Sequence, residues 1–305
     1  MLPRVMNLCL SNLCDASCVF CPRRANGVPS ETPMMSLNVA VRAIGQARAN
    51  NIRDFGSVSE NGDCWCNQQA VEILRVLRAL IPDARVQVFT NFLRMTPALT
   101  DVLLAEGLVN RVTMNMDGLG AEYERTRGIP YETVRKHLLH FLSKRGDRRL
   151  PLSMRILSLK RYCDAMTRWF GRLPPGLPVV EHEDAGAVIR EWKKFLDLTQ
   201  DDICFSPALA CCHRDLATGD QAKYECPNLG RVENECFIAP NGDWYACCAM
   251  TRQNVTFGNI VEKSLSEMAE SPERARFIAA LRLHRYSEIG YPCDTVQACQ
   301  CVETK

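Results

Sequence analysis

The stretch Cys14-Asp-Ala-Ser-Cys18-Val-Phe-Cys21 places three cysteines within eight residues, directly after a short apolar segment at residues 5–10. Three thiolates at this spacing let one loop wrap a single metal site from one side. A structural zinc site needs four protein ligands, and no His or fourth Cys follows at zinc-finger spacing. A cubane held by three cysteines leaves one iron open, so the stretch favours an iron–sulfur cluster. The alternatives are a zinc knuckle or a reduced thiol cluster.

Cysteine is frequent in the rest of the chain as well. The 305 residues include 17 cysteines, and ten of them fall between residues 204 and 301. Their number is odd, the N-terminus has no export signal, and a chain of this length buries a core without disulfides. We therefore expect a reducing, cytoplasmic compartment and two metal centres, one towards each end of the sequence.

The charge balance excludes several classes of partner. Thirty-seven basic and 35 acidic residues leave a net charge of +2, so no strong field is available to attract a nucleic-acid backbone or an anionic membrane. No apolar run approaches the roughly 18 residues that a membrane-spanning helix needs. We expect a globular chain that has neither nucleic acid nor membrane as its partner.

Helical and β-type patterns alternate along the first half of the chain, which is typical of βαβ units around a parallel sheet. We expect strands at 54–59, 85–90, 111–115 and 152–157, and helices at 36–48, 67–80, 96–106 and 131–144. The run Pro-Pro-Gly-Leu-Pro at 174–178 ends this pattern and indicates a domain boundary near 175–190. A last amphipathic helix is expected at 272–283.

A second group of cysteines surrounds a predicted β-hairpin at residues 236–248. An apolar strand leads into the turn Pro240-Asn-Gly242, and a second strand ends in Cys247 and Cys248. A hairpin of this kind can hold a metal cluster near its base, and a zinc site on the same cysteines is the alternative. Further cysteines lie before and after the hairpin: Cys226, Cys293, Cys299 and Cys301.

With these motifs the sequence resembles the radical SAM family, whose hallmark Cys-x3-Cys-x2-Cys follows the first strand of a partial (β/α)6 barrel. The resemblance implies a [4Fe-4S] cluster on Cys14, Cys18 and Cys21. It also implies that the amino and carboxylate groups of S-adenosylmethionine (AdoMet) chelate the open iron. In this family the reduced cluster cleaves AdoMet, and the 5′-deoxyadenosyl radical takes a hydrogen atom from the substrate. A flavodoxin- or ferredoxin-type protein is the implied electron donor.

The region after the barrel resembles the SPASM or twitch extension of these enzymes, which binds auxiliary [4Fe-4S] clusters. Gly242-x4-Cys247 and Gly258-Asn-Ile260 match its pattern, but the tail has only three cysteines. We therefore expect one auxiliary cluster, held by Cys247, by Cys226 or Cys236, and by two of Cys293, Cys299 and Cys301. The implied fold class is α/β, with a partial (β/α)6 TIM-like barrel at 1–185 and a small hairpin-and-helix iron–sulfur domain at 186–305.

The resemblance also implies residues that bind AdoMet. The family's Gly-Gly-Glu motif, which binds the methionyl amine, has two possible counterparts after the second strand: Glu60, or Gly62-Asp63, which we prefer because it keeps a small residue before an acidic one. Arg155 on a later strand could reach the methionyl carboxylate. Polar residues after other strands resemble those that line the nucleoside and substrate pocket, with a simple turn role as the alternative: Thr90, Asn91, Asn115 and Asp117.

The implied function is a radical SAM oxidoreductase that dehydrogenates or cross-links a biosynthetic substrate, with the auxiliary cluster as electron acceptor. Thirteen residues precede Cys14, too few for a leader-peptide recognition domain, which favours either a small molecule such as a sugar or aminocyclitol or a short peptide bound without such a domain. The alternative is an epimerase or peptide maturase with a cysteine hydrogen donor. Candidate donors, for which core packing is the other interpretation, are Cys64, Cys66, Cys211 and Cys212. Two alternatives come from other classes. One is a non-catalytic iron–sulfur electron carrier, which would not need the long βαβ scaffold, and the other is a zinc-stabilised binding module.

Overall fold

The structure is a computed structural model of the chain. It describes residues 1–21, 31–59, 61–146, 148–157, 160, 163, 167, 185–205, 224–226, 228–248, 253, 255–290, 293 and 302–303. Five of the predicted site residues lie outside these described residues: Glu60, Cys211, Cys212, Cys299 and Cys301.

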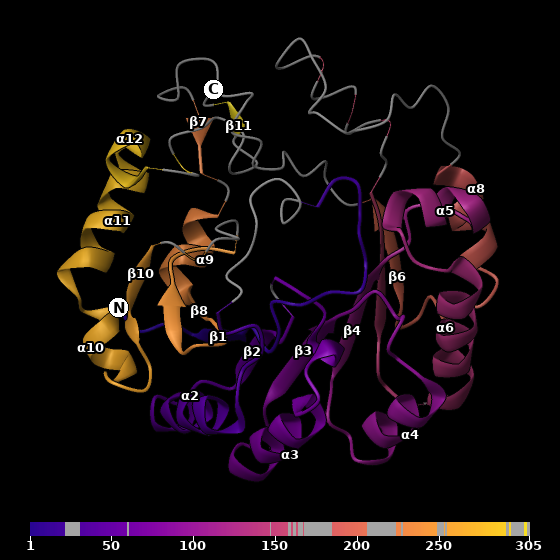
Figure 1. Cartoon of the computed structure of the whole chain (residues 1–305), viewed down its shortest axis with the longest axis horizontal. Coiled ribbons are helices and arrows are strands. Elements are labelled where there is room, and N and C mark those ends of the chain that lie inside the picture. Colours follow the sequence, from indigo (N-terminus) through magenta and orange to yellow (C-terminus); the bar gives the residue numbers. More distant parts are fainter. Residues whose placement is uncertain are drawn as a thin grey trace.

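A nine-stranded, mostly parallel sheet forms the centre of the molecule (Figure 1). Six of its strands are parallel and follow one another across the sheet in chain order, with β6 at an open edge. These strands are β1 (Val5–Leu8), β2 (Asp54–Ser57), β3 (Arg85–Phe89), β4 (Arg111–Asn115), β5 (Leu152–Ile156) and β6 (Asp202–Phe205). The expected partial (β/α)6 barrel is thereby confirmed.

Helices cover the outer face of the six parallel strands (Figure 1). They are α2 (Leu37–Ala49), α3 (Ala70–Leu80), α4 (Pro97–Ala105), α5 (Gly120–Arg127), α6 (Tyr131–Arg145) and α8 (Ala185–Trp192). The side chains of Ser36 and Thr96 cap α2 and α4 by accepting hydrogen bonds from backbone N–H groups of the first turn. The helix expected at 67–80 begins only at Ala70, and a short 3-10 helix, η1 (Cys64–Cys66), precedes it.

The hairpin of the C-terminal region continues the barrel sheet. Strands β8 (Glu235–Ile238) and β9 (Asp243–Tyr245) pair antiparallel, as expected, and β10 (Thr256–Asn259) extends the hairpin. On its other side β8 pairs in parallel with β1, so that Val5 lies opposite Glu235. The predicted division of the chain between residues 185 and 186 stays a prediction.

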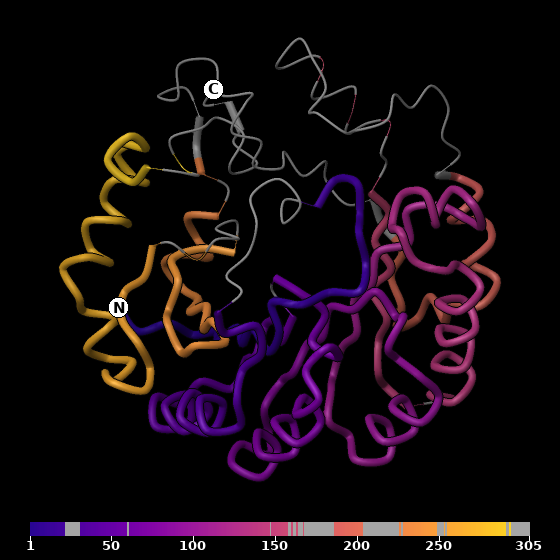
Figure 2. Tube along the Cα trace, in the orientation of Figure 1, coloured from indigo at the N-terminus to yellow at the C-terminus, as the bar shows by residue number. Residues whose placement is uncertain are grey.

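The remaining elements flank this hairpin. They are β7 (Tyr224–Glu225), which pairs with β11 (Val302–Glu303), and the helices α9 (Leu229–Asn234), α10 (Leu265–Ala269), α11 (Pro272–Arg282) and α12 (Tyr286–Ile289). The N-terminus lies beside α11 (Figure 2), where Arg274 donates a hydrogen bond to the carbonyl of Met1 at 3.3 Å. One buried apolar cluster includes residues of β1, the barrel helices and the hairpin. No helix among the described residues combines the length and apolar character needed to span a membrane.

Candidate active site

One loop, residues 11–21, carries Cys14, Cys18 and Cys21, and we call it the cysteine loop. It leaves the carboxyl end of β1 and runs across the sheet to α5 (Figure 2). There the N–H groups of Ser17 and Val19 donate to the carbonyls of Arg127 and Thr126, both at 3.0 Å. The loop is therefore held at one end by the sheet and near the other by the last turn of α5.

Two polar side chains approach the sulfurs of this loop. The amide Nδ2 of Asn91 lies 3.6 Å from Cys14 Sγ, and Nη1 of Arg127 lies 3.3 Å from Cys18 Sγ. Cys18 is buried, whereas Cys14 and Cys21 are half-buried. Hydrogen bonds from N–H groups favour a thiolate, the form of cysteine that binds metal.

The cysteine loop has side chains that suit an iron–sulfur cluster. Within the described residues no group of three or more His, Cys, Asp or Glu side chains is placed to hold one metal ion. A cubane binds each cysteine at a different iron, so its ligands need not converge on one point. Three thiols with N–H donors beside two of them are a suitable donor set for such a cluster.

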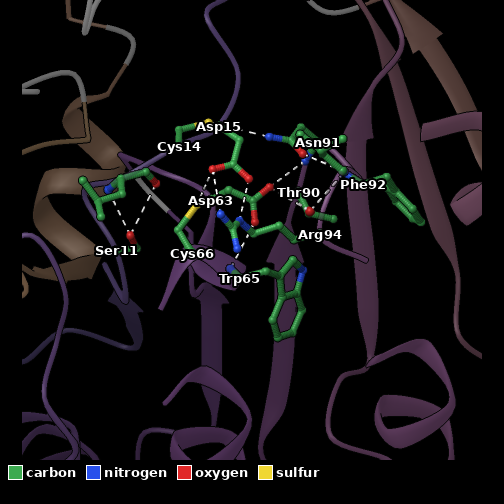
Figure 3. Close-up of polar contacts among 12 residues, drawn as sticks. Ser11, Cys14, Asp15, Asp63, Trp65, Cys66, Thr90, Asn91, Phe92 and Arg94 are labelled. Carbon is green, nitrogen blue, oxygen red and sulfur yellow. Dashed lines mark hydrogen bonds and ion pairs between the residues drawn. The ribbon is translucent and has the colours of Figure 1, made fainter. Parts of the chain in front are cut away.

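Asp63 is the centre of a buried hydrogen-bond network at this end of the sheet (Figure 3). Its Oδ2 accepts hydrogen bonds from Thr90 Oγ1 and from the backbone N of Asn91, both at 2.9 Å, and its Oδ1 accepts from the backbone N of Trp65 at 3.1 Å. Burial raises the pKa of Asp63, while these hydrogen bonds act in the opposite direction. The carboxylate thus ties the segment after β2 to the residues that follow β3.

The neighbouring glycine brings this segment against the cysteine loop. The N–H of Asp63 donates to the carbonyl of Leu13 at 2.9 Å. A Cβ at Gly62 would lie 2.2 Å from that carbonyl oxygen and 2.4 Å from the carbonyl oxygen of Ser11. Only glycine allows this backbone approach, so Gly62-Asp63 forms a junction between two loops. A role for this pair towards the methionyl amine stays a prediction.

An ion pair lies beside the cysteine loop and includes Asp15, the residue that follows Cys14 in the sequence. Arg94 forms an ion pair with Asp15, whose Oδ1 also lies 3.5 Å from the thiol of Cys66 (Figure 3). Desolvation, with smaller contributions from Asp63 and Asp15, raises the pKa of Cys66 to about 12. Cys66 is therefore a protonated, half-buried thiol near neutral pH.

Cys64, two residues earlier, has a different environment. Its side chain is completely buried in the apolar core, and this burial raises its pKa. Of the two described candidates for hydrogen donation, Cys66 contacts the cysteine loop through Asp15. Cys64 instead has the environment of a core residue.

The polar residues of β4 and β5 have contrasting positions. Asn115 and Arg155 are paired residues at the carboxyl ends of the two strands, and both are half-buried. The Arg155 guanidinium lies 5.3 Å from the centroid of the Phe89 ring. Asp117 has no exposed side-chain surface: it forms an ion pair with Arg127 and accepts a hydrogen bond from the backbone N of Leu157 at 2.7 Å. Its contacts make Asp117 a partner of Arg127.

Sequence reasoning missed Arg94 and Arg127, which the structure places beside the cysteine loop. It also missed α5, because the sequence Gly-Ala-Glu-Tyr-Glu-Arg-Thr-Arg has no apolar stripe. One signal was present: Arg127 precedes Gly128, and a basic residue followed by glycine is typical of a helix C-terminus. Arg94 contacts Asp15 and Arg127 contacts Cys18, which lie 79 and 109 positions away in the sequence. No local sequence pattern reports contacts at such a distance.

The predicted auxiliary ligands that the structure describes are all buried: Cys226, Cys236, Cys247 and Cys293. Cys236 lies on β8 in the apolar core, and its thiol donates to the carbonyl of Val5 at 3.5 Å. Burial raises the pKa of this thiol. Cys248, which the sequence analysis did not select, lies 2.9 Å from Nη1 of Arg231.

A three-cysteine loop at the carboxyl end of the first of six parallel strands places the chain in the fold class of the radical SAM enzymes. Residues 226–300 match the SPASM family, an iron–sulfur cluster-binding domain. A search of the curated proteins finds no match. The fold and the domain match together confirm the resemblance to radical SAM enzymes with a C-terminal SPASM-type domain.

Several solved structures share the fold at low sequence identity. BtrN in complex with AdoMet and 2-DOIA is 14% identical with a TM-score of 0.61, and the match covers 100% of this chain and 94% of that one. Streptococcus suis SuiB bound to S-adenosylmethionine is 14% identical (TM-score 0.61; 98% and 77% covered). The anSMEcpe structure with AdoMet and the Cp18Cys peptide is 11% identical (TM-score 0.60; 96% and 87% covered).

Proposed function

We propose that this chain is a radical SAM oxidoreductase with one auxiliary iron–sulfur cluster. The observation that carries the proposal is the cysteine loop at the carboxyl end of β1, anchored by α5 and by the Asp63 network. Cys14, Cys18 and Cys21 would hold a [4Fe-4S] cluster, with AdoMet at its open iron. When bound, this pair supplies the 5′-deoxyadenosyl radical that takes a hydrogen atom from the substrate.

The residues around the loop have separate tasks in this proposal. Asn91 and Arg127 donate to the sulfurs of Cys14 and Cys18. Asn115 and Arg155, paired on β4 and β5, are the half-buried polar residues assigned to AdoMet and substrate. Carboxyl ends of parallel strands are where barrel enzymes of this kind assemble their sites.

The auxiliary cluster would be held by Cys226, Cys247 and Cys293, with Cys299 or Cys301 as the fourth ligand. We leave out Cys236 because its thiol, which has no exposed surface, donates to the backbone carbonyl of Val5 on β1. A second cluster near the substrate supplies an acceptor for the electron that remains after hydrogen abstraction. This favours a two-electron oxidation, such as a dehydrogenation or a ring closure.

We propose a small molecule as the substrate, in a biosynthetic pathway. The whole chain is covered by the match to BtrN, whose structure holds the small molecule 2-DOIA. The second substrate class that we propose is a short peptide, because the similar anSMEcpe structure holds a bound peptide. We place the enzyme in the cytoplasm, where thiols stay reduced and a flavodoxin- or ferredoxin-type protein can donate electrons.

The test is reductive cleavage of AdoMet by the reconstituted protein under anaerobic conditions. With dithionite and AdoMet we expect 5′-deoxyadenosine, and we expect none from Cys14→Ala, Cys18→Ala or Cys21→Ala. Cys163→Ala, a buried cysteine outside the loop, is the matched control and should retain cleavage. Absence of 5′-deoxyadenosine from fully reconstituted protein would overturn the proposed function.

A second candidate function is an epimerase or peptide maturase in which Cys66 returns a hydrogen atom to the substrate radical. It is favoured by the protonated thiol of Cys66 beside Asp15 in the cysteine loop. With the true substrate in deuterated water, deuterium at carbon in the product, lost in Cys66→Ala, would select this function over oxidation.

A further inference from the structure

The last turn of α5 and the cysteine loop interlock at the backbone. Besides the two hydrogen bonds from Ser17 and Val19, Gly128 follows the helix with φ +67°. A Cβ at this glycine would lie 1.9 Å from Ser17 Oγ. Position 128 therefore has a left-handed backbone that favours glycine, and a Cβ there would force the hydroxyl of Ser17 to move. The interlock places the side chain of Arg127 directly over the loop.

Arg127 is a buried cation with three partners. It forms an ion pair with Asp117, its Nη1 lies 3.3 Å from Cys18 Sγ, and its guanidinium carbon lies 5.0 Å from the centroid of the Phe20 ring. Both members of the ion pair are buried, with side-chain exposures of 8% and 0%. A buried charge acts more strongly on its neighbours than an exposed one, because solvent does not screen it.

Asp117, the partner of Arg127, is itself held by the backbone at the end of β5. Asp117 accepts the backbone N–H of Leu157 at 2.7 Å and so fixes the position of the guanidinium. In addition, Nε of Arg127 is buried and has no hydrogen-bond partner among the described residues. Buried donors usually have an acceptor, and the inorganic sulfides of a cluster on Cys18 are acceptors of a suitable kind.

We propose that Arg127, held by Asp117, is a positioning residue that orients Cys18 and raises the reduction potential of the N-terminal cluster. This inference rests on the proposed function, in that it requires a cluster on Cys18. Reduction adds one electron, supplied by the external donor, and makes the cluster more negative. A nearby cation and N–H···S hydrogen bonds stabilise that state relative to the oxidised one.

The test is a redox titration of the reconstituted holoprotein, followed by electron paramagnetic resonance. The signal of the N-terminal cluster is identified by its change on addition of AdoMet, to which a cluster without an open iron does not respond. The principal variant is the double substitution Arg127→Gln/Asp117→Asn, which removes both charges and leaves no unpaired carboxylate. Arg127→Lys keeps the charge without the planar fork of donors.

We expect the double variant to bind iron as the wild type does and to have a more negative midpoint potential. The midpoint potential of Arg127→Lys should lie between those of the double variant and the wild type, and the line shape of its resonance signal should be altered. Arg94→Gln/Asp15→Asn is the matched control, because it also removes both charges of an ion pair at the cysteine loop, but Arg94 is half exposed and solvent screens it. We expect its midpoint to remain close to that of the wild type.

The outcomes separate this inference from the proposed function. A double variant that loads its cluster and has an unchanged midpoint overturns the role of Arg127. An equal shift in Arg94→Gln/Asp15→Asn also overturns it, because any nearby ion pair would then suffice. If the wild type itself forms no AdoMet-responsive cluster, the proposed function fails first. Circular dichroism of each variant verifies its folding, and Arg127→Lys provides the comparison if the double variant does not fold.

Discussion

Asp63 accepts a hydrogen bond from the backbone N–H of Asn91 at 2.9 Å, and the side chain of Asn91 reaches the sulfur of Cys14. One buried carboxylate therefore sets the position of a residue that contacts the cysteine loop (Figure 3). The two residues lie 28 positions apart, on the loops that follow β2 and β3. This relationship leads to the first prediction.

Asp63→Ala should destabilise the apo-protein by about 1–3 kcal/mol, because it leaves buried donors of Trp65, Thr90 and Asn91 without their acceptor. Urea unfolding measures the change, with Asp83→Ala at an exposed ion pair as the control. If Asp63 served only as a ligand for the methionyl amine, the apo-protein would keep its stability and only AdoMet affinity would fall.

Gly62→Ala should destabilise the protein by about 3 kcal/mol or more, because the added Cβ meets two backbone carbonyls that cannot rotate away. Gly45→Ala is the matched control: this glycine lies within α2, and a Cβ added there would have no neighbouring atom within 4 Å. We expect that control to stabilise by about 0.5–1 kcal/mol. Thermal unfolding of both variants tests the pair, and equal effects would contradict the junction at Gly62.

Cys66 should react slowly with iodoacetamide in the apo-protein at pH 8. Its pKa of about 12 leaves almost all of the thiol protonated, and the thiolate is the nucleophile. The rate should rise about tenfold per pH unit above pH 8 and level off near pH 12. Mass spectrometry of the peptide that contains Cys66 measures the rate. A plateau near pH 9 would mean that the thiol is not desolvated.

Cys247→Ala should remove about half of the iron, from about eight to about four atoms per chain, while AdoMet cleavage by the N-terminal cluster persists. Cys236→Ala is the control, because the thiol of Cys236 donates to the carbonyl of Val5 and its removal should leave the iron content unchanged. Iron and sulfide assays measure both. A loss of iron in Cys236→Ala would restore that residue to the ligand set, and four irons with one zinc in the wild type would replace the auxiliary cluster by a zinc site.

Much of the molecule follows from local sequence patterns. The spacing of Cys14, Cys18 and Cys21 defines a loop whose three cysteines are neighbours along the chain. The alternation of strands and helices predicts a parallel sheet, because each pattern reflects which face of an element is buried. The turn of the hairpin is also local, and β8 and β9 form where the Pro-Asn-Gly sequence indicates. The capping residues Ser36 and Thr96 act within a few positions of themselves, so the sequence alone reports them.

Tertiary structure decided the features that depend on residues far apart in the chain. Cys64 and Cys66 are alike as sequence, yet one lies in the core and the other beside Asp15. Cys236 belongs to the core because β8 pairs with β1, more than 200 residues away. The contact of Arg127 with Cys18 arises only when α5 docks on the cysteine loop. Burial and hydrogen bonding across such distances depend on how the elements pack, and packing is a property of the folded chain as a whole.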